Sequence, residues 1–100
     1  MQNIYDIEWS DEALYNLSAI VHYLETNWTE REIENFFHRI DNVLNLIAKN
    51  PLLFSLTNKR KNVRRCVLSK QTSIYYKFEN DKIFLITLFD NRQAPKKLKV

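Results

Sequence analysis

Apolar residues in the first half of the chain recur in steps of three and four, the spacing that forms one stripe along an α-helix. Two such stripes occur: Leu14, Leu17, Val21, Leu24 and Trp28, and then Ile33, Phe36, Ile40, Val43 and Ile47. Ser10 suits the N-cap of the first helix, which we expect to end near Asn27. Thr29 and Glu32 have the capping-box spacing for the second helix, and Asn50-Pro51 should end it. The very short link between them predicts an antiparallel helical hairpin.

Runs with the pattern of β-strands flank this helical region. Residues 3–9 alternate apolar and acidic side chains, and residues 62–68, 72–79 and 82–90 are rich in β-branched and aromatic residues. Asn80-Asp81 suits a two-residue hairpin turn. The expected fold class is therefore α+β: an N-terminal strand, an antiparallel two-helix hairpin and a three-stranded antiparallel meander.

The last predicted strand is apolar on both faces, which is typical of a central strand covered on both sides. The helical hairpin covers only one side, so the C-terminal tail or a partner is needed for the other. Residues 1–100 suit one domain. Its expected core includes Leu17, Val21, Leu24, Ile33, Phe36, Ile40, Ile74, Tyr76, Leu85 and Ile86.

The net charge of +3 divides unevenly between the two halves of the chain. Residues 1–50 hold three basic and nine acidic residues, a net of −6, and residues 51–100 hold twelve basic and three acidic, a net of +9. Such a division indicates a basic face for a polyanion or an acidic protein. The alternative is internal pairing, in which the acidic helices complement the basic sheet. That alternative leaves surplus positive charge on the second half.

Several function classes are disfavoured by composition. No apolar run approaches the ~18 residues of a membrane span, and the first residues lack the pattern of a signal peptide. Glycine is absent, which excludes a glycine-rich phosphate loop. Cys66 is the only cysteine, so we expect a reducing, cytoplasmic setting without disulfide, metal or cofactor. His22 and His38 fall on the predicted helices without metal-ligand spacing, and we expect structural or surface roles for them and packing for Cys66.

A group of cations and phenols remains as candidate chemistry. It consists of Lys59, Lys61, Arg64, Arg65, Lys70, Tyr75, Tyr76 and Arg92. Such a group could hold phosphates and stabilise a pentacoordinate transition state, or it could bind an acidic peptide. Taken singly, most of these cations would be ordinary solvated residues. Arg64 and Arg65 are adjacent in a strand and so should point to opposite faces, one of them toward a covered groove.

Four stretches of the sequence resemble the RelE/ParE superfamily of toxins. They are Trp9-Ser10-Asp11-Glu12-Ala13, Val63-Arg64-Arg65-Cys66-Val67-Leu68, Ser73-Ile74-Tyr75-Tyr76-Lys77 and Leu88-Phe89-Asp90-Asn91-Arg92-Gln93-Ala94-Pro95. Their joint order and spacing extend the resemblance over roughly residues 4–98. The resemblance implies a toxin of a type II toxin–antitoxin pair, held inactive by a cognate antitoxin whose flexible, often acidic segment wraps across it.

The superfamily has two mechanisms, and the resemblance leaves both open. RelE-like members cleave mRNA on the ribosome with basic residues and a C-terminal Tyr or His, whereas ParE-like members poison DNA gyrase. Arg92 stands where the family commonly has an arginine, but residues 93–100 contain neither Tyr nor His. This departure favours gyrase poisoning, with Lys59, Lys61, Arg64, Arg65, Lys70 and Arg92 as expected target-binding residues. For an mRNA nuclease the candidates are Arg64, Arg65, Tyr75, Tyr76 and Arg92; a non-toxic nucleic-acid-binding or adaptor module is a further alternative.

Overall fold

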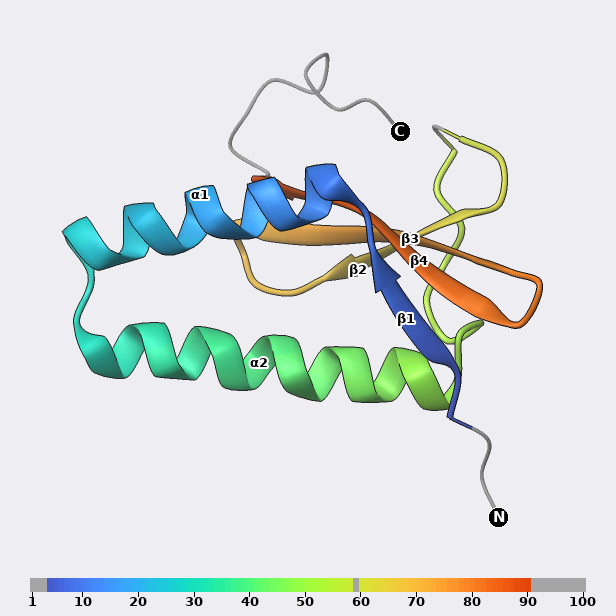
Figure 1. Cartoon of the computed structure of the whole chain (residues 1–100), viewed down its shortest axis with the longest axis horizontal. Coiled ribbons are helices and arrows are strands. Elements are labelled where there is room, and N and C mark those ends of the chain that lie inside the picture. Colours follow the sequence, from blue (N-terminus) through green and yellow to red (C-terminus); the bar gives the residue numbers. More distant parts are fainter. Residues whose placement is uncertain (1–3, 59, 91–100) are drawn as a thin grey trace.

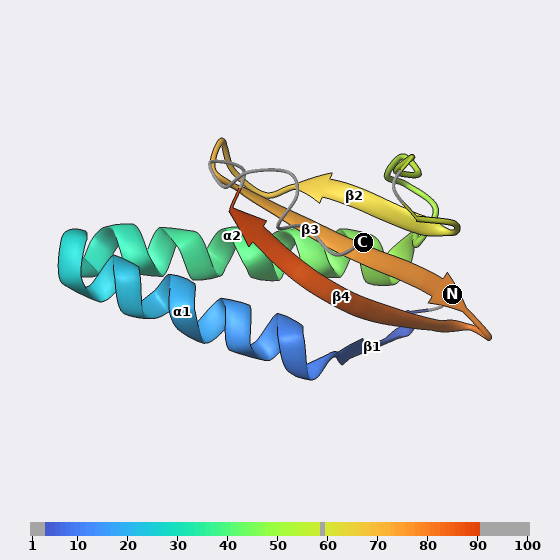
Figure 2. The same ribbon diagram turned by 90° about the horizontal axis from the view of Figure 1, so that it is seen from above.

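The computed structural model describes residues 4–58 and 60–90. In order, they form β1 (Asp6–Trp9), α1 (Asp11–Asn27), α2 (Glu30–Lys49), β2 (Val63–Val67), β3 (Thr72–Glu79) and β4 (Lys82–Asp90). The helices run antiparallel to each other and pack through one core against the sheet (Figures 1 and 2). The predicted α+β arrangement of strand, helical hairpin and meander is confirmed. In the part described, no helix is long and apolar enough to cross a membrane.

The four strands form one mixed sheet in the order β1-β4-β3-β2. The meander pairs antiparallel, and β1 joins it by pairing parallel to β4. This places β4 between two neighbours, as its apolar sequence predicted. A parallel neighbour needs a crossover connection, and the helical hairpin supplies part of it.

A β-bulge interrupts the regular pairing of β4 with β3. Tyr75 pairs with Thr87 and Tyr76 with Leu85, so Ile86 is the extra residue. Ser10 Oγ donates a hydrogen bond to the carbonyl of Ile86 at 2.7 Å, and Ser10 Oγ itself accepts one from Ala13 N at 2.9 Å. Ser10 therefore caps α1 and ties the start of that helix to the bulge.

The predicted limits of both helices are confirmed by their caps. Ser10 is the N-cap of α1, and Thr29 forms a complete capping box with Glu32 at the start of α2. α2 ends at Lys49 with Asn50 as C-cap, directly before Pro51. Sequence signals fixed these ends because each depends only on residues within one turn of the cap.

The buried face of α1 is rotated from the predicted stripe. Ala13 and Leu24 are buried, with Leu17 and Ile20 packed beside them, whereas Leu14 is 50% exposed and Val21 only half-buried. A polar contact explains the rotation. Asn16 Oδ1 accepts hydrogen bonds from Thr87 Oγ1 at 2.7 Å and Leu88 N at 3.2 Å, which turns its side of the helix toward β4.

The main core lies between the helical hairpin and the sheet. Of the residues expected there, Leu24, Phe36, Ile40, Ile74, Tyr76 and Leu85 are buried. Leu17 and Ile33 are partly buried against the same cluster. Ile86 belongs to a second cluster, with Val63, Tyr75 and Phe89. The reason is strand alternation, because adjacent residues such as Leu85 and Ile86 point to opposite faces of the sheet.

Three residues other than glycine have positive φ angles in the described part of the chain: Asn62 at 64°, Asn80 at 52° and Asp81 at 61°. Asn and Asp tolerate this left-handed region better than most side chains. Consecutive positive φ angles at Asn80 and Asp81 correspond to a two-residue hairpin turn whose twist matches its strands. The turn predicted between the last two strands is confirmed.

Candidate functional site

The predicted cationic cluster is divided by the structure rather than gathered on one surface. Lys59 and Arg92 lie outside the described residues. Lys61 precedes β2 and Lys70 lies in the turn between β2 and β3, and both are exposed. The two lysines of the cluster that the structure describes thus stand at the two ends of β2.

Arg64 and Arg65 point to opposite faces of β2, as the strand alternation predicted. The Arg64 guanidinium is partly buried and Nη1 donates to the carbonyls of Phe54 at 2.7 Å and Leu52 at 3.5 Å. Arg65 is exposed. Arg64 therefore binds the protein's own backbone, and Arg65 is the arginine of the pair that is open to an outside anion.

The two tyrosines of β3 also lie on opposite faces, and neither is at the surface. Tyr76 is 0% exposed and its hydroxyl donates to the Pro51 carbonyl at 2.8 Å. Burial raises the pKa of Tyr76 to about 12, against the opposing effect of the Arg64 charge. Tyr75 is buried in the second cluster. The hydroxyl of Tyr76, one of the candidate groups for a nuclease, is therefore held inside the core.

The histidines and the cysteine are separate from the cationic residues. His22 and His38 are exposed on α1 and α2. Cys66 packs in the main core, where burial raises the pKa of its thiol to about 11. Among residues 4–58 and 60–90 no group of three potential ligands could hold a metal ion. A buried, protonated thiol is suited to packing rather than to nucleophilic attack.

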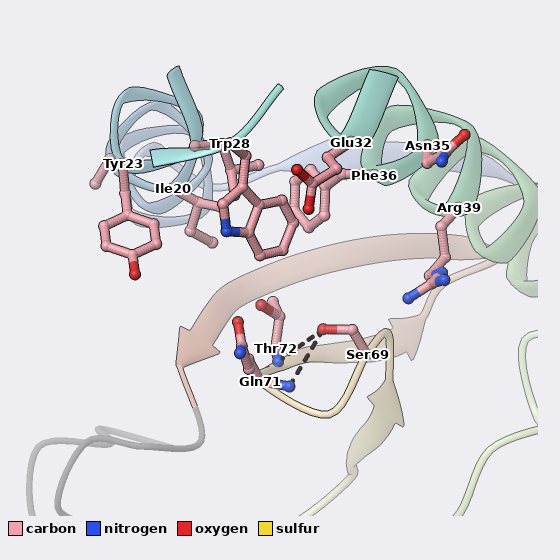
Figure 3. A pocket seen from close by; sticks show the side chains of 12 residues that line it. Ile20, Tyr23, Trp28, Glu32, Asn35, Phe36, Arg39, Ser69, Gln71 and Thr72 are labelled. Atoms are coloured by element: carbon pink, nitrogen blue, oxygen red, sulfur yellow. Dashed lines mark hydrogen bonds between the residues drawn. The ribbon is translucent and has the colours of Figure 1, made fainter. Parts of the chain in front are cut away.

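A cleft of about 470 Å³ opens where the helical hairpin extends beyond the sheet (Figure 3). Its roof consists of Ala19, Ile20, Tyr23, Leu24 and Trp28, from α1 and its C-cap, and of Glu32, Asn35, Phe36 and Arg39 from α2. Its floor is Ser69 and Gln71 of the β2–β3 turn and Thr72 at the start of β3. The volume lies within the ~300–1,000 Å³ of typical ligand pockets.

The cleft lies where the connected ends of the two helices extend beyond the strands. In Figure 1 the α1–α2 connection projects past the ends of β3 and β4. Its apolar underside remains partly open, with Trp28 36% and Tyr23 44% exposed.

The floor of the cleft is a well-ordered turn. Ser69 Oγ accepts hydrogen bonds from the backbone N–H groups of Gln71 and Thr72, each at 3.2 Å. The N–H groups of Leu68 and Ser69 donate to the Thr72 carbonyl at 2.9 and 3.1 Å. In Figure 3 the indole of Trp28 faces this turn across the cleft, with Arg39 at one side. The cleft offers an apolar interior and a polar rim, the combination that accepts apolar side chains of a peptide.

Sequence reasoning missed this cleft, although a signal was present. Trp28 was placed on the apolar stripe of the first helix, but not among the expected core residues. The signal was an aromatic residue at the very end of the stripe, at the C-cap of α1, where Trp28 is 36% exposed. The sequence could not show that the sheet stops short of this residue, because that depends on how the helices pack on the strands.

A family model shows the family of this chain, and solved structures show its type of fold. A family model described as the ParE toxin of the type II toxin–antitoxin system parDE matches residues 7–95. Curated protein sequences give no significant match.

Solved structures give three informative likenesses. The chromosomal ParDE system of P. aeruginosa matches with a TM-score of 0.73 and 12% identity, over 88% of this chain and 97% of that one. The E. coli DinJ-YafQ toxin–antitoxin complex matches with a TM-score of 0.61 and 13% identity, over 86% of this chain and 91% of that one. The YoeB-YefM complex of Staphylococcus aureus matches with a TM-score of 0.59 and 14% identity, over 85% of this chain and 94% of that one. At these identities the likeness concerns the fold.

Proposed function

Because the chain belongs to the ParE toxins of type II toxin–antitoxin systems, we propose that it inhibits growth by poisoning DNA gyrase and is neutralised by a cognate antitoxin. The burial of Tyr76 is the observation that favours gyrase over mRNA as the target. A nuclease of the related RelE type needs a group that moves protons, and Tyr76 was a candidate for it. The proposed place of action is the cytoplasm.

Proton transfer works best when the pKa of the catalytic group lies near the working pH. Tyr76 has a pKa of about 12, a hydroxyl engaged with Pro51 and no exposed surface. His22 and His38 stand on the helices, and the cations Lys61, Arg65 and Lys70 stand on or beside β2. These placements favour a toxin that acts by binding its target over one that cleaves RNA.

The antitoxin is proposed to use the cleft under the helical hairpin. The P. aeruginosa, E. coli and S. aureus structures are described as a toxin–antitoxin system or as complexes of such pairs. In this chain the cleft presents the rings of Trp28 and Phe36 above a polar turn, with Arg39 at its rim. An antitoxin segment with an apolar residue for the interior and a carboxylate for Arg39 fits this chemistry.

Arg92 lies outside the described residues, and its function stays a proposal. Its guanidinium fork can bind a phosphate or carboxylate through two hydrogen bonds, which lysine reproduces poorly. We expect Arg92→Ala to abolish growth inhibition while antitoxin binding persists, and Arg92→Lys to restore inhibition only in part. Full toxicity of a folded alanine variant would shift the assignment to Lys61, Arg64 and Arg65.

The target is tested by inducing the chain without its antitoxin. We expect DNA breaks linked to gyrase in the cell, and trapped cleavage complexes when purified chain is mixed with gyrase and plasmid. Primer extension should show no new cuts in translated mRNA. Cuts within the ribosomal A-site codon without gyrase-linked breaks would favour the RelE-like mechanism. Unimpaired growth with confirmed expression would favour a non-toxic module.

A further inference from the structure

The segment between α2 and β2 carries three exposed leucines. We call residues 50–58 the leucine loop. Leu52 is 59%, Leu53 49% and Leu56 55% exposed. Scattered surface leucines are ordinary, but three within five residues of one connection form a concentrated apolar surface. Exposing these leucines to water is unfavourable, which indicates a function that requires their exposure.

The backbone of the leucine loop is fixed along its length. Side chains of the sheet hold two of its carbonyls, since Tyr76 Oη donates to Pro51 O at 2.8 Å and Arg64 Nη1 donates to Phe54 O at 2.7 Å. Three backbone hydrogen bonds complete the attachment. Leu53 N donates to Asn50 O at 3.1 Å, Arg65 N to Ser55 O at 3.0 Å and Thr57 N to Val63 O at 2.8 Å. The leucines are therefore displayed by a rigid support rather than exposed through slack in the chain.

The surroundings of the leucine loop are positively charged. Residues 42–78 contain eight Lys and Arg residues and no Asp or Glu. Within this stretch Arg60, Lys61 and Arg65 are exposed and lie in the chain that returns from the loop into β2. Glu79 is the first carboxylate after it, and Lys77 contacts this group at 3.5 Å. An acidic partner would meet little electrostatic opposition here.

We propose that the leucine loop is the docking surface for the protein that this toxin attacks, an acidic protein with an apolar recess that receives Leu52, Leu53 and Leu56. Identifying that protein with gyrase rests on the proposed function. A pre-organised backbone lowers the entropic cost of association, which suits a defined protein site. Single-stranded nucleic acid would instead favour aromatic side chains on which bases stack.

The docking surface and the antitoxin cleft lie at opposite ends of the molecule. Figures 1 and 2 place the leucine loop beside the start of β2, far from the α1–α2 connection that roofs the cleft. The longest extent of the chain is 39 Å, which ~12 extended residues span. An antitoxin anchored in the cleft could thus reach the leucine loop and deny it to the target.

The test compares Leu52→Ser/Leu53→Ser/Leu56→Ser with Leu14→Ser, an equally exposed leucine on α1. Circular dichroism and thermal unfolding establish that each variant is folded. We expect the triple variant to lose growth inhibition and to bind purified gyrase at least tenfold more weakly, while Leu14→Ser behaves as the wild type. A folded triple variant with full toxicity would overturn the proposal.

Additional measurements separate this inference from the choice of gyrase. If wild type fails to bind gyrase but the triple variant is still harmless, the docking surface stands and the gyrase target is wrong. Two further probes are a 20-nucleotide RNA and vesicles of phosphatidylglycerol and phosphatidylcholine. Wild-type binding to either one, lost in the triple variant, would reassign the leucines to nucleic acid or membrane and overturn the proposal.

Discussion

Neighbouring arginines in β2 have different physical settings, and this difference is testable. Arg64 donates a charge-assisted hydrogen bond to Phe54 O at 2.7 Å, whereas Arg65 is exposed. Hydrogen bonds to charged groups contribute ~1.5–3 kcal/mol, and exposed substitutions usually change stability by less than ~0.5 kcal/mol. We expect Arg64→Ala to lower the free energy of unfolding by about 2 kcal/mol and Arg65→Ala to leave it unchanged. Urea unfolding measures both, and equal losses would refute the distinction.

Tyr76 should make the protein sensitive to alkali. Its pKa is about 12 in the folded chain and ~10 when unfolded, so the unfolded chain loses this proton first as pH rises. The stability that Tyr76 contributes is thus fully present below pH ~10, and about 2–3 kcal/mol of it is lost as pH approaches 12. The buried thiol of Cys66, with a pKa of about 11, adds to the same loss.

Tyr76→Phe isolates the contribution of this phenol. At pH 7 the variant loses the hydrogen bond to Pro51 O, which should cost ~1–2 kcal/mol. Above pH 10 it should lose less stability than the wild type, because only the Cys66 contribution is common to both chains. Unfolding curves at pH 7, 9 and 11 provide the comparison. Parallel losses in the two proteins would show that Tyr76 does not titrate as described.

For single residues, the sequence predicted the face to which a side chain points but not the group that it contacts. Strand alternation indicated that Arg64 and Arg65 diverge, and they do. It could not indicate that Arg64 would meet the carbonyl of Phe54, because that contact depends on the path of a connection ten residues away. The same applies to Tyr76 and Pro51, which are separated by 25 positions in the chain.

Helices and turns were the most predictable elements, since their limits depend on local chemistry. Thr29 accepts a hydrogen bond from Glu32 N at 3.2 Å, and Glu32 Oε1 accepts from Thr29 N at 3.2 Å. Loss of an N-cap side chain costs ~0.5–2 kcal/mol. We expect Thr29→Ala to destabilise the protein by about 1 kcal/mol, measured by thermal unfolding. Ser18→Ala, an exposed position within α1, is the matched control, and an equal effect there would contradict the capping account.

The rotation of α1 and the parallel pairing of β1 were not predicted. Both result from contacts between distant segments: Asn16 with Thr87 and Leu88, and β1 with β4. The spacing of apolar residues shows that a helix has an apolar face. It does not show whether an apolar residue at the border of that face is buried or exposed. The choice was made by the hydrogen bonds of Asn16, which no helical pattern reveals.

Two surfaces with different charge and shape lie at opposite ends of the molecule. One end holds the cleft under the acidic helical hairpin, and the other holds the leucine loop with its surrounding cations (Figure 1). The sequence predicted the unequal charge of the two halves, because charge needs only counting. It did not predict either surface, since each depends on which apolar residues the sheet leaves uncovered.

This separation predicts that neutralisation and toxicity can be uncoupled by mutation. Trp28→Ser removes the largest ring of the cleft, and aromatic anchors of this kind commonly contribute ~2 kcal/mol or more to binding. We expect affinity for the cognate antitoxin to fall at least ~30-fold, so that antitoxin co-expression no longer restores growth. Toxicity without antitoxin should persist, because the leucine loop is unchanged.

Tyr15→Ser, which alters a 73% exposed aromatic of α1 outside the cleft, should affect neither property. Calorimetric titration and growth curves decide the matter: a folded Trp28→Ser variant that binds antitoxin normally, or one that has become harmless, would show that the two ends do not divide the functions in this way.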